Sequence, residues 1–339
     1  MKILFDHSAP FLLAHGGQQI QIEETKRALE QIGIQVEWLR WWDSAQTGNI
    51  IHYFGIPDHG YLQRAEAKGL SVILTHLLSA TCNRPDWKLR LQGLVIATLL
   101  RIPGWGIIRN QLTWKSLAAA KRIVVGLEAE KEALELGFNV EPKKVSVVPL
   151  GLSAPFLGVT PASRSGDYLI TTGTIYEVKR SVELAQMARA ANVPLLFVGK
   201  PYSETAPYWQ EFKLLIDGHY VRYLPHVENR DEMVRLLQNA RGFVLFSWFE
   251  NWCLAAQEAV ACGLPLLVQN QKWSQERFGR HASFLEPGGT LESNATRLKK
   301  FYDECPSLPV PSIPIPTWEN VAKRLAEIYR EVASHQDSH

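Results

Sequence analysis

Short apolar runs alternate with segments of helical periodicity along nearly the whole chain, which is typical of a parallel α/β architecture. In the first half, strands are predicted at 2–7, 34–39, 50–54, 70–76, 122–126 and 145–149, with an amphipathic helix at 18–32. A second series has strands at 167–173, 194–199, 220–224, 242–246 and 264–268, with a helix over 179–192. Two such series predict two doubly wound, Rossmann-like domains facing one another, with ligands bound beyond the carboxyl ends of the strands in an inter-domain cleft.

Two proline-rich segments interrupt this pattern. Residues 149–166 are rich in Pro, Gly and Ser and have no period, so we interpret them as the linker between the domains. Residues 306–317 form a second, extended crossing, and a helix with apolar residues at helical spacing is predicted over 318–332. A length of 339 residues agrees with two domains, each large enough for its own core.

Composition and charge exclude several classes of protein. The chain has 46% hydrophobic and 21% charged residues, which describe an ordinary globular protein. Its net charge of +2 says nothing about nucleic acid, and we expect no nucleic-acid partner. The start of the chain is too quickly polar for a secretory signal, and the longest apolar run, between Arg90 and Arg101, is too short to span a membrane. The four cysteines form no C-x-x-C pair, which favours free thiols in a reducing cytoplasm.

The segment FSWFENWCLAAQEAVACGLPLL carries the most specific chemistry. Glu250 lies in the loop after an apolar strand, and Glu258 lies in the helix that follows, with seven residues between them. A helix that begins directly after a buried strand directs backbone N–H groups and a positive dipole end at its ligand, which suits a diphosphate. Carboxylates suit the hydroxyl groups of sugars. The segment predicts a nucleotide-sugar site; the alternative is an acidic first turn and a solvated glutamate.

Several motifs in the same order resemble the GT-B retaining glycosyltransferases of family 4, also described as glycosyl transferases group 1. The strongest is Glu250-x7-Glu258 followed by EAVACGLPLLV, which is similar to the family's EAMACGTPVV pattern. TTGTIYEVKRS is similar to the VGRL…KG turn, with Lys179 six residues after Gly173, and VSVVPLGLS is similar to the segment ending IPNGVD. The first loop, with Gly16 and Gly17, and the closing helix WENVAKRLAEIYREV also match.

This resemblance implies the division of the chain. An acceptor-binding domain would cover 1–155, a nucleotide-sugar-binding domain would cover 156–317, and the helix at 318–334 would pack back on the first domain. It also implies a hexosyltransferase that moves a sugar from a nucleoside diphosphate to a saccharide or lipid-linked acceptor in polysaccharide or glycolipid biosynthesis, with retention of configuration.

The resemblance also assigns roles to the two glutamates. Glu258 would bind the ribose hydroxyls, and Glu250 would meet donor-sugar hydroxyls and stabilise the positive charge of the transition state. Lys179 would stabilise the departing diphosphate. We expect the remaining donor contacts from glycine backbone, from helix-end amides and from neighbouring polar groups, at Gly16, Gly17, Gly173, Thr174, Arg180, Asn251, Trp252, Cys253 and Leu254.

Histidines at strand ends are further possible site residues. His76 ends a predicted strand and occupies the place of the family's active-site histidine facing the sugar, although a hydrogen-bonded structural role is the alternative. His52 fits a structural role better, with acceptor contact as the lesser alternative. We interpret His7 and His15 as polar loop residues.

The chain departs from the family pattern in the diphosphate-binding segments. Thr174 stands where the family has Arg, so one diphosphate cation is absent unless Arg180 replaces it. The family's EGFG loop is ENWC here, which keeps the backbone amides but loses two glycines. No D-x-D pair occurs in the chain, so we expect neither a metal nor another cofactor.

Residues 84–122 predict a membrane contact on the acceptor side. They contain eight Lys or Arg and one Asp, a net charge of +7, with Trp87, Trp105 and Trp114 among leucines and isoleucines. Basic residues beside tryptophan suit an anionic membrane, here the inner face, and a core helix with solvated arginines is the alternative.

Two other functions remain open from the sequence. A nucleotide-sugar epimerase could use the same fold, although the pattern of Lys179 and Glu258 fits transfer better. A catalytically silent GT-B protein that binds a nucleotide or a partner enzyme would account for Thr174 and the ENWC loop.

Overall fold

The computed structural model describes residues 1–8, 11, 16–75, 79–99 and 113–334. The chain divides into two compact units. The first unit comprises Met1–Gly151 together with Pro316–His339, and the second comprises Leu152–Ile315. The chain therefore passes between units within each of the two proline-rich segments.

The first unit is built on a six-stranded parallel sheet with the order β2-β1-β3-β4-β5-β6. Its strands are β1 (Lys2–His7), β2 (Gln35–Trp38), β3 (Ile50–Phe54), β4 (Ser71–Thr75), β5 (Arg122–Val125) and β6 (Val145–Val147). The chain leaves β1 toward β2 on one side and returns to β3 on the other. This reversal of strand order lies at the carboxyl ends of β1 and β3, where doubly wound sheets bind ligands.

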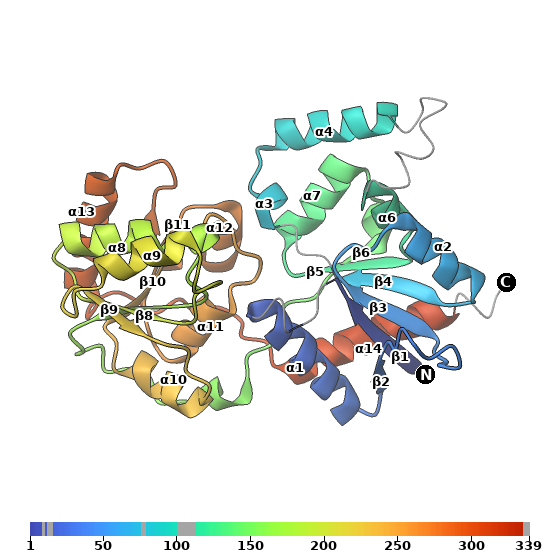
Figure 1. Cartoon of the computed structure of the whole chain (residues 1–339), viewed down its shortest axis with the longest axis horizontal. Coiled ribbons are helices and arrows are strands. Elements are labelled where there is room, and N and C mark those ends of the chain that lie inside the picture. The colour runs from blue at the N-terminus through green and yellow to red at the C-terminus, as the bar shows by residue number, and fades with distance from the viewer. Residues whose placement is uncertain (9–10, 12–15, 76–78, 100–112, 335–339) are drawn as a thin grey trace. The chain divides into compact units, whose positions relative to one another are not determined.

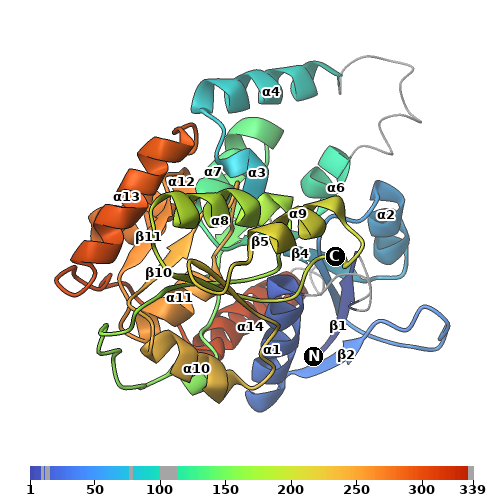
Figure 2. The ribbon, with the colours of Figure 1, turned by 60° about the vertical axis from the view of Figure 1, so that its left-hand side comes forward.

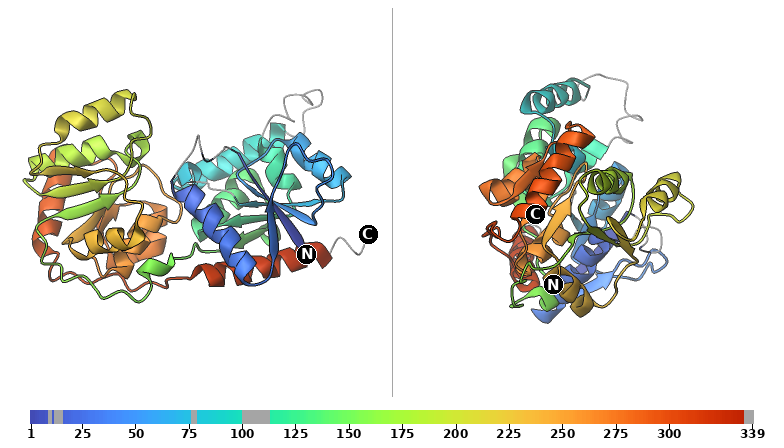
Figure 3. Two further views of the ribbon diagram at one scale, coloured as in Figure 1. Left: turned by 60° about the horizontal axis from the view of Figure 1, so that its bottom comes forward. Right: turned by 90° about the vertical axis from the view of Figure 1, so that its left-hand side faces the viewer.

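Helices cover both faces of this sheet. They are α1 (Gly17–Gln31), α2 (His59–Ala67), α3 (Ser79–Cys82), α4 (Asp86–Leu99), α6 (Thr113–Ala119), α7 (Glu128–Phe138) and α14 (Trp318–Ser334), with a 3₁₀ turn η1 (Pro142–Lys144). Figure 1 shows α1 and α14 along one face and α2, α6 and α7 along the other. The left view of Figure 3 shows the length of α14 beside α1.

Alternate strand residues pack on these two helical layers, as the two-residue period of a strand requires. Leu4, Ile51 and Leu74 belong to the core beneath α2, α6 and α7. On the opposite face, His52 of β3 contacts Tyr329 of α14. The final helix is thus part of the first unit's core, although more than 160 residues separate it from β6.

The second unit repeats the architecture with the strand order β12-β11-β10-β7-β8-β9, again parallel. Its strands are β7 (Leu169–Thr172), β8 (Leu195–Val198), β9 (Val221–Leu224), β10 (Gly242–Leu245), β11 (Leu266–Gln269) and β12 (Ser283–Leu285). Its helices are α8 (Ser181–Ala190), α9 (Pro207–Leu215), α10 (Arg230–Gln238), α11 (Leu254–Ala261), α12 (Lys272–Phe278) and α13 (Leu291–Glu304), with 3₁₀ turns η2 (Ala154–Phe156), η3 (Glu177–Lys179) and η4 (Gly279–His281).

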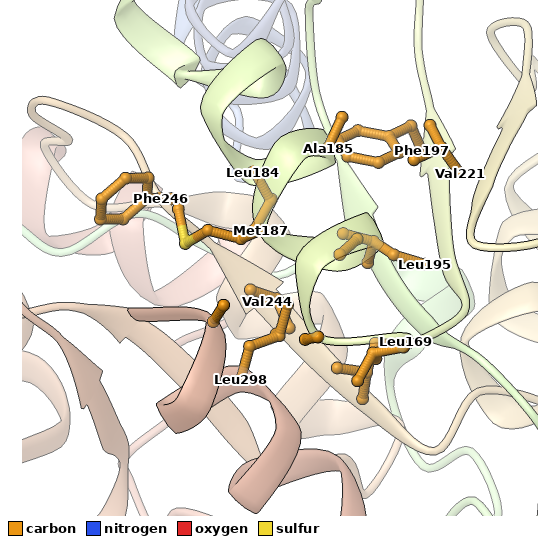
Figure 4. Close-up of a cluster of buried hydrophobic side chains, with 14 of the residues drawn as sticks. Leu169, Leu184, Ala185, Met187, Leu195, Phe197, Val221, Val244, Phe246 and Leu298 are labelled. Atoms are coloured by element: carbon orange, nitrogen blue, oxygen red, sulfur yellow. The ribbon is translucent and has the colours of Figure 1, made fainter. Parts of the chain in front are cut away.

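The core of the second unit lies between its sheet and α8, α9 and α13. Figure 4 shows Leu184 and Met187 of α8 against Val244 and Phe246, with Leu298 of α13 beside them. Figure 1 places α10 and α11 on the other face of the sheet. This arrangement sets the first residues of α11 at the carboxyl edge of β10, the edge at which a ligand is expected.

The predicted α/β class and two doubly wound parallel sheets are confirmed. Two details differ from the sequence-based expectation. The helix expected over 179–192 begins at Ser181, because Arg180 has a left-handed backbone with φ 51° and ends a separate 3₁₀ turn. Strand β12 was not expected, because its three residues are too few to show a period.

Candidate functional site

The carboxyl edge of the second sheet carries a glycine turn between β7 and η3. Gly173 has φ 149°, a backbone conformation that favours glycine, and its N–H donates to the carbonyl of Val198 over 3.0 Å. A Cβ on Gly199, at the end of β8, would lie 2.0 Å from the carbonyl oxygen of Gly173. Two glycines therefore allow β7 and β8 to approach closely. Gly173, Thr174 and Lys179 line a small recess there.

Lys179 lies in the 3₁₀ turn η3 and not in the first turn of the following helix, contrary to the helix boundary predicted from the sequence. The left-handed Arg180 after it separates η3 from α8. The backbone N–H of Trp248 donates to the carbonyl of Val178 over 2.8 Å, which ties the loop after β10 to η3. This contact brings the loop that carries Glu250 beside Lys179.

Lys179 and Glu250 form an ion pair between these two segments. Their side chains are 24% and 10% exposed. Burial lowers the pKa of Lys179, but the Glu250 carboxylate more than offsets it, so the pKa of Lys179 is raised above its ordinary value. The lysine therefore keeps its charge at neutral pH. A cation and a carboxylate are therefore paired next to the Gly173 turn.

Helix α11 begins at Leu254, four residues after Glu250. Its N-cap, Cys253, is buried and has a left-handed backbone with φ 55°. Burial, and then the charge of Glu250, raise the pKa of the Cys253 thiol well above its ordinary value, so this thiol is not a thiolate nucleophile. Leu254 opens the helix and is partly exposed, as is Asn251 in the loop before it. The helix start that the sequence predicted is thus present.

Trp252 is a buried support for this loop. Its indole N–H donates to the Gln257 side chain, and the guanidinium of Arg277 lies 3.5 Å from the centre of its ring. Burial lowers the pKa of Arg277 to about 10. The indole therefore fixes the segment from which the first amides of α11 point, and any donor contact of Trp252 would come from its backbone.

Glu258 is buried in α11 and forms an ion pair with Arg230, the first residue of α10. Burial raises the pKa of Glu258, and Arg230 opposes this rise. The guanidinium of Arg230 also lies 4.9 Å from the ring of Phe156. Sequence reasoning did not find Arg230, because only tertiary structure brings residues 28 positions apart together.

Arg180 is held between two aromatic rings. Its guanidinium carbon lies 3.8 Å from the centre of Phe246 and 4.0 Å from that of Trp248. It also donates to Glu183 over 3.2 Å and to the carbonyl of Pro287 over 3.3 Å. This sandwich joins the start of α8 to the loop after β10, and sequence reasoning did not find the two aromatic partners.

The predicted residues of the first unit are placed as follows. Gly16, with φ 127°, is the N-cap of α1, and Gly17 is its first residue with open space where a Cβ would stand. His76 and His15 lie outside the described residues. His7 ends β1 and stacks on Phe11 with ring centres 4.6 Å apart.

His52 is fully buried. Its ring nitrogens are 2.6 Å from the hydroxyl of Tyr329 and 2.7 Å from that of Thr75. Burial lowers the pKa of His52 to about 3, so the ring is neutral. These contacts describe the structural role that the sequence favoured.

Within the described residues, no three His, Cys, Asp or Glu side chains are grouped so that they could hold a metal ion. Among the helices of that same part of the chain, none combines the length and apolar character needed to cross a membrane.

Residues 168–304 match the family model described as Glycosyl transferases group 1. The O-antigen chain mannosyltransferase B of Escherichia coli is 23% identical over 206 residues, which cover 56% of this chain and 54% of that protein. The chain thus matches about half the length of this curated relative. The matched family segment contains Lys179, Glu250 and Glu258.

Comparison of structures extends the likeness to the whole chain. Sucrose-phosphate synthase of Thermosynechococcus elongatus has a TM-score of 0.69 and 15% identity, over 99% of this chain and 100% of its own. Anabaena Alr3699/HepE, solved with UDP and glucose, has a TM-score of 0.66 and 13% identity, over 97% and 99% of the two chains. The glycosyltransferase of Rickettsia africae has a TM-score of 0.64 and 13% identity, with 98% of each chain covered. At such identities these likenesses establish the GT-B fold.

Proposed function

This chain has the GT-B fold and a second unit of the glycosyl transferases group 1 type, and from that premise we propose that it moves a sugar from a nucleoside diphosphate to a saccharide or lipid-linked acceptor. The observation that carries the proposal is the pairing of Lys179 with Glu250 beside the Gly173 turn and the start of α11. Lysine, glycine backbone and helix amides together suit a diphosphate, and the carboxylates suit hydroxyl groups.

In the proposed transfer, Lys179 and Glu250 stabilise charges of opposite sign. Lys179 stabilises the negative charge that grows on the leaving diphosphate, and the amides of α11 add the positive end of the helix dipole. Because the incoming diphosphate competes with Glu250 for Lys179, the carboxylate becomes available to the hydroxyls of the donor sugar. It then also stabilises positive charge at the anomeric carbon.

Glu258 has a different environment and a different proposed partner. Its carboxylate is buried and paired with Arg230, so it suits a fixed hydrogen-bond acceptor for the ribose hydroxyls. Arg180, between Phe246 and Trp248, is proposed to hold the loop of Glu250 in place and to supply the cation that Thr174 cannot. Gly16 and Gly17 would let the first loop approach the donor closely.

Nucleoside diphosphate release tests the proposal. The protein is incubated with GDP-mannose, UDP-glucose and further nucleotide sugars in the presence of EDTA, with the Glu250→Gln variant in parallel. The first two donors are chosen because one relative is named a mannosyltransferase and one similar structure holds UDP and glucose. We expect one donor to be turned over without metal, and the variant to lose about 10²–10³ in rate.

The exposed Glu177, two residues from Lys179, provides a matched control. Glu177→Gln should retain the wild-type rate, because it removes a nearby carboxylate without breaking the ion pair. Absence of release from every donor, or full activity of Glu250→Gln, would remove the proposal. NMR of the product tests the retaining outcome, because the anomeric configuration of donor and product should agree.

The same assay separates the two alternatives. An epimerase would return an altered nucleotide sugar without transfer. A silent binding protein would be stabilised against heat by the nucleotide without turnover. The ion pair of Lys179 and Glu250 favours transfer, because it places a leaving-group cation beside a carboxylate.

On the acceptor side, the proposal includes contact of the first unit with an anionic membrane through α4. Trp87, Leu91 and Leu94 are 63%, 53% and 65% exposed on the outer side of this helix. The inner side is tied to α7 by two hydrogen bonds, from the Gln92 amide to the carbonyl of Gly137 and from the Asn139 amide to that of Gly93. Trp105 of the same basic segment lies outside the described residues. An apolar stripe with basic neighbours suits a membrane surface.

Flotation with vesicles tests this part. Vesicles containing phosphatidylserine should carry the wild-type protein at low salt, and Trp87→Ala with Leu91→Ala should abolish binding. Leu214→Ala is the control, because Leu214 is 83% exposed on α9 of the second unit. Equal flotation of all three proteins, or none with wild type, would exclude the contact.

A further inference from the structure

Two adjacent tryptophans, Trp41 and Trp42, stand almost entirely in solvent. They are 80% and 83% exposed, compared with 63% for Trp87 on α4. A single exposed apolar side chain is ordinary, but two neighbouring indoles form a continuous apolar surface, and such surfaces mark binding sites. The loop that carries them, residues 39–49, follows β2 and projects from the first unit (Figure 2).

This loop is fixed on both sides of the tryptophans. The Arg40 guanidinium donates to Asp43 over 2.7 and 2.9 Å and forms an ion pair with Glu37 at 3.1 Å. The backbone N–H of Arg40 donates to Gln46 over 2.8 Å, and the Gln46 amide donates to the carbonyl of Trp38 over 3.0 Å. The two indoles are therefore held on a preorganised loop, which lowers the entropy lost when a ligand binds.

The position of the loop points to a ligand of the first unit. It begins at the carboxyl end of β2, which runs parallel to β1, so both strands end at the same edge of the sheet. At that edge His7 and Phe11 are stacked, and both meet Trp38 edge-on, with ring centres 6.0 and 5.8 Å apart. Doubly wound sheets bind their ligands at this edge.

Charge indicates which ligand the tryptophans fit. Arg40 is balanced by Glu37 and Asp43, and Lys2 forms an ion pair with Glu37 at 2.8 Å. The surroundings of the indoles thus have as many negative as positive groups, which favours neither an anionic lipid surface nor a phosphate. A sugar ring is uncharged and has a face of C–H groups that can cover an indole, with hydroxyls at its rim to meet polar neighbours.

We propose that Trp41 and Trp42 form a stacking platform for neutral sugar rings of the acceptor saccharide. The proposal rests on the glycosyltransferase function above and specifies its acceptor as a saccharide at least long enough to reach the loop after β2. It makes this loop a determinant of acceptor specificity and assigns it no part in donor turnover.

A glycan array printed with neutral oligosaccharides of mannose, glucose, galactose and N-acetylglucosamine tests the platform. The full-length protein is applied beside the Trp41→Ala/Trp42→Ala variant and the Leu214→Ala control. We expect wild type and control to be retained on a subset of the glycans. We expect the double variant to bind that subset at least about tenfold more weakly, because it removes both indole surfaces on which the sugar rings would stack.

The same proteins are applied to phosphatidylserine vesicles, and their donor hydrolysis is measured without acceptor. The platform requires that the double variant keep both vesicle binding and donor hydrolysis at the wild-type level. The platform is overturned if wild type is retained on no glycan, or if wild type and the double variant are retained equally. It is also overturned if the double variant loses only vesicle binding, because the loop would then be a membrane contact. Failure of donor hydrolysis in wild type would count against the proposed transfer reaction and would leave glycan retention as a separate result.

Discussion

At the scale of single residues, Lys179 and Glu250 are energetically coupled. Each is largely shielded from water and each has the other as its charged partner. Removing one member of a shielded ion pair leaves the other charge with its desolvation cost and without compensation. The same two residues are therefore predicted to control both stability and donor turnover, and the two effects separate in a double variant.

Lys179→Met should lower the free energy of unfolding by about 1–3 kcal/mol, because Glu250 is left unpaired. Lys179→Met combined with Glu250→Gln should recover most of this loss and remain inactive. Urea unfolding followed by tryptophan fluorescence measures the first effect and nucleoside diphosphate release the second. Additive losses in the double variant would show that the two side chains are not coupled.

His52 is predicted to make stability depend on pH. Its folded pKa of about 3 lies below the ordinary value of 6.5, so the unfolded chain binds the proton more strongly between these values. The contribution of the neutral His52 ring to the free energy of unfolding is fully present above pH 6.5. It is lost as the pH falls toward 3, by about 1.4 kcal/mol per pH unit. We expect a loss of about 2 kcal/mol between pH 7 and pH 5.

The quantity to measure is how strongly the free energy of unfolding depends on pH. Urea unfolding at pH 7 and pH 5 should show a smaller difference in His52→Gln than in wild type, because glutamine does not titrate. The variant also loses contacts to Tyr329 or Thr75, so its absolute stability is not informative. An equal dependence on pH in both proteins would assign the acid sensitivity to other groups.

At the scale of elements, the glycines that end β7 and β8 set the geometry of the donor edge. Gly199→Ala would place a Cβ 2.0 Å from the carbonyl oxygen of Gly173, at a φ of 155°. We expect a loss of about 2–4 kcal/mol, because a backbone clash adds to the strained conformation. The turn that precedes Lys179 should be displaced, so donor binding should weaken as well.

Gly218→Ala is the matched comparison. Gly218 has φ 72°, and a Cβ there would meet nothing within 4 Å, so only conformational strain of about 1–2 kcal/mol is expected. Thermal unfolding and nucleotide-induced stabilisation should be measured for both variants. Equal effects would show that the close approach of Gly199 to Gly173 has little energetic weight.

Elements built on apolar runs could be predicted from the sequence, and elements set by single conformations could not. The strands of both sheets, apart from β12, lie within or beside the expected ranges, because buried parallel strands are continuous apolar runs. The break between η3 and α8 gave no signal, because it depends on a left-handed arginine rather than on glycine. The sandwich of that arginine between Phe246 and Trp248 explains why the conformation is kept.

At the scale of the whole molecule, the last helix belongs to the first unit. The buried side of α14 contributes Trp318, Val321, Ala322, Leu325, Ala326, Ile328, Tyr329 and Val332. A Cβ on Gly151 would lie 2.5 Å from the backbone nitrogen of Trp318. The start of α14 therefore packs directly on Gly151, the last residue of the segment 1–151 of the first unit. The core of this unit therefore requires both ends of the chain.

Truncation tests this dependence. Residues 152–315 should fold alone with a cooperative unfolding transition, because their core is complete within that range. Residues 1–151 should not, because burial of eight side chains of α14 is lost, and adding residues 316–339 as a separate peptide should restore helical structure. Circular dichroism during urea titration measures both. A cooperative transition of 1–151 alone would contradict the assignment of α14 to this core.

The sequence by itself determined the fold class, the alternation of strands and helices, and the positions of Lys179, Glu250 and Glu258 beside a glycine turn and a helix start. These follow from local patterns, because apolar periodicity and the spacing of a motif lie within short stretches of chain. Only the tertiary structure decided what each of these charges meets: Glu250 for Lys179, Arg230 for Glu258, two aromatic rings for Arg180, and Tyr329 for His52. Such partners are 28 to 277 positions apart, and a contact between them exists only after the chain has folded.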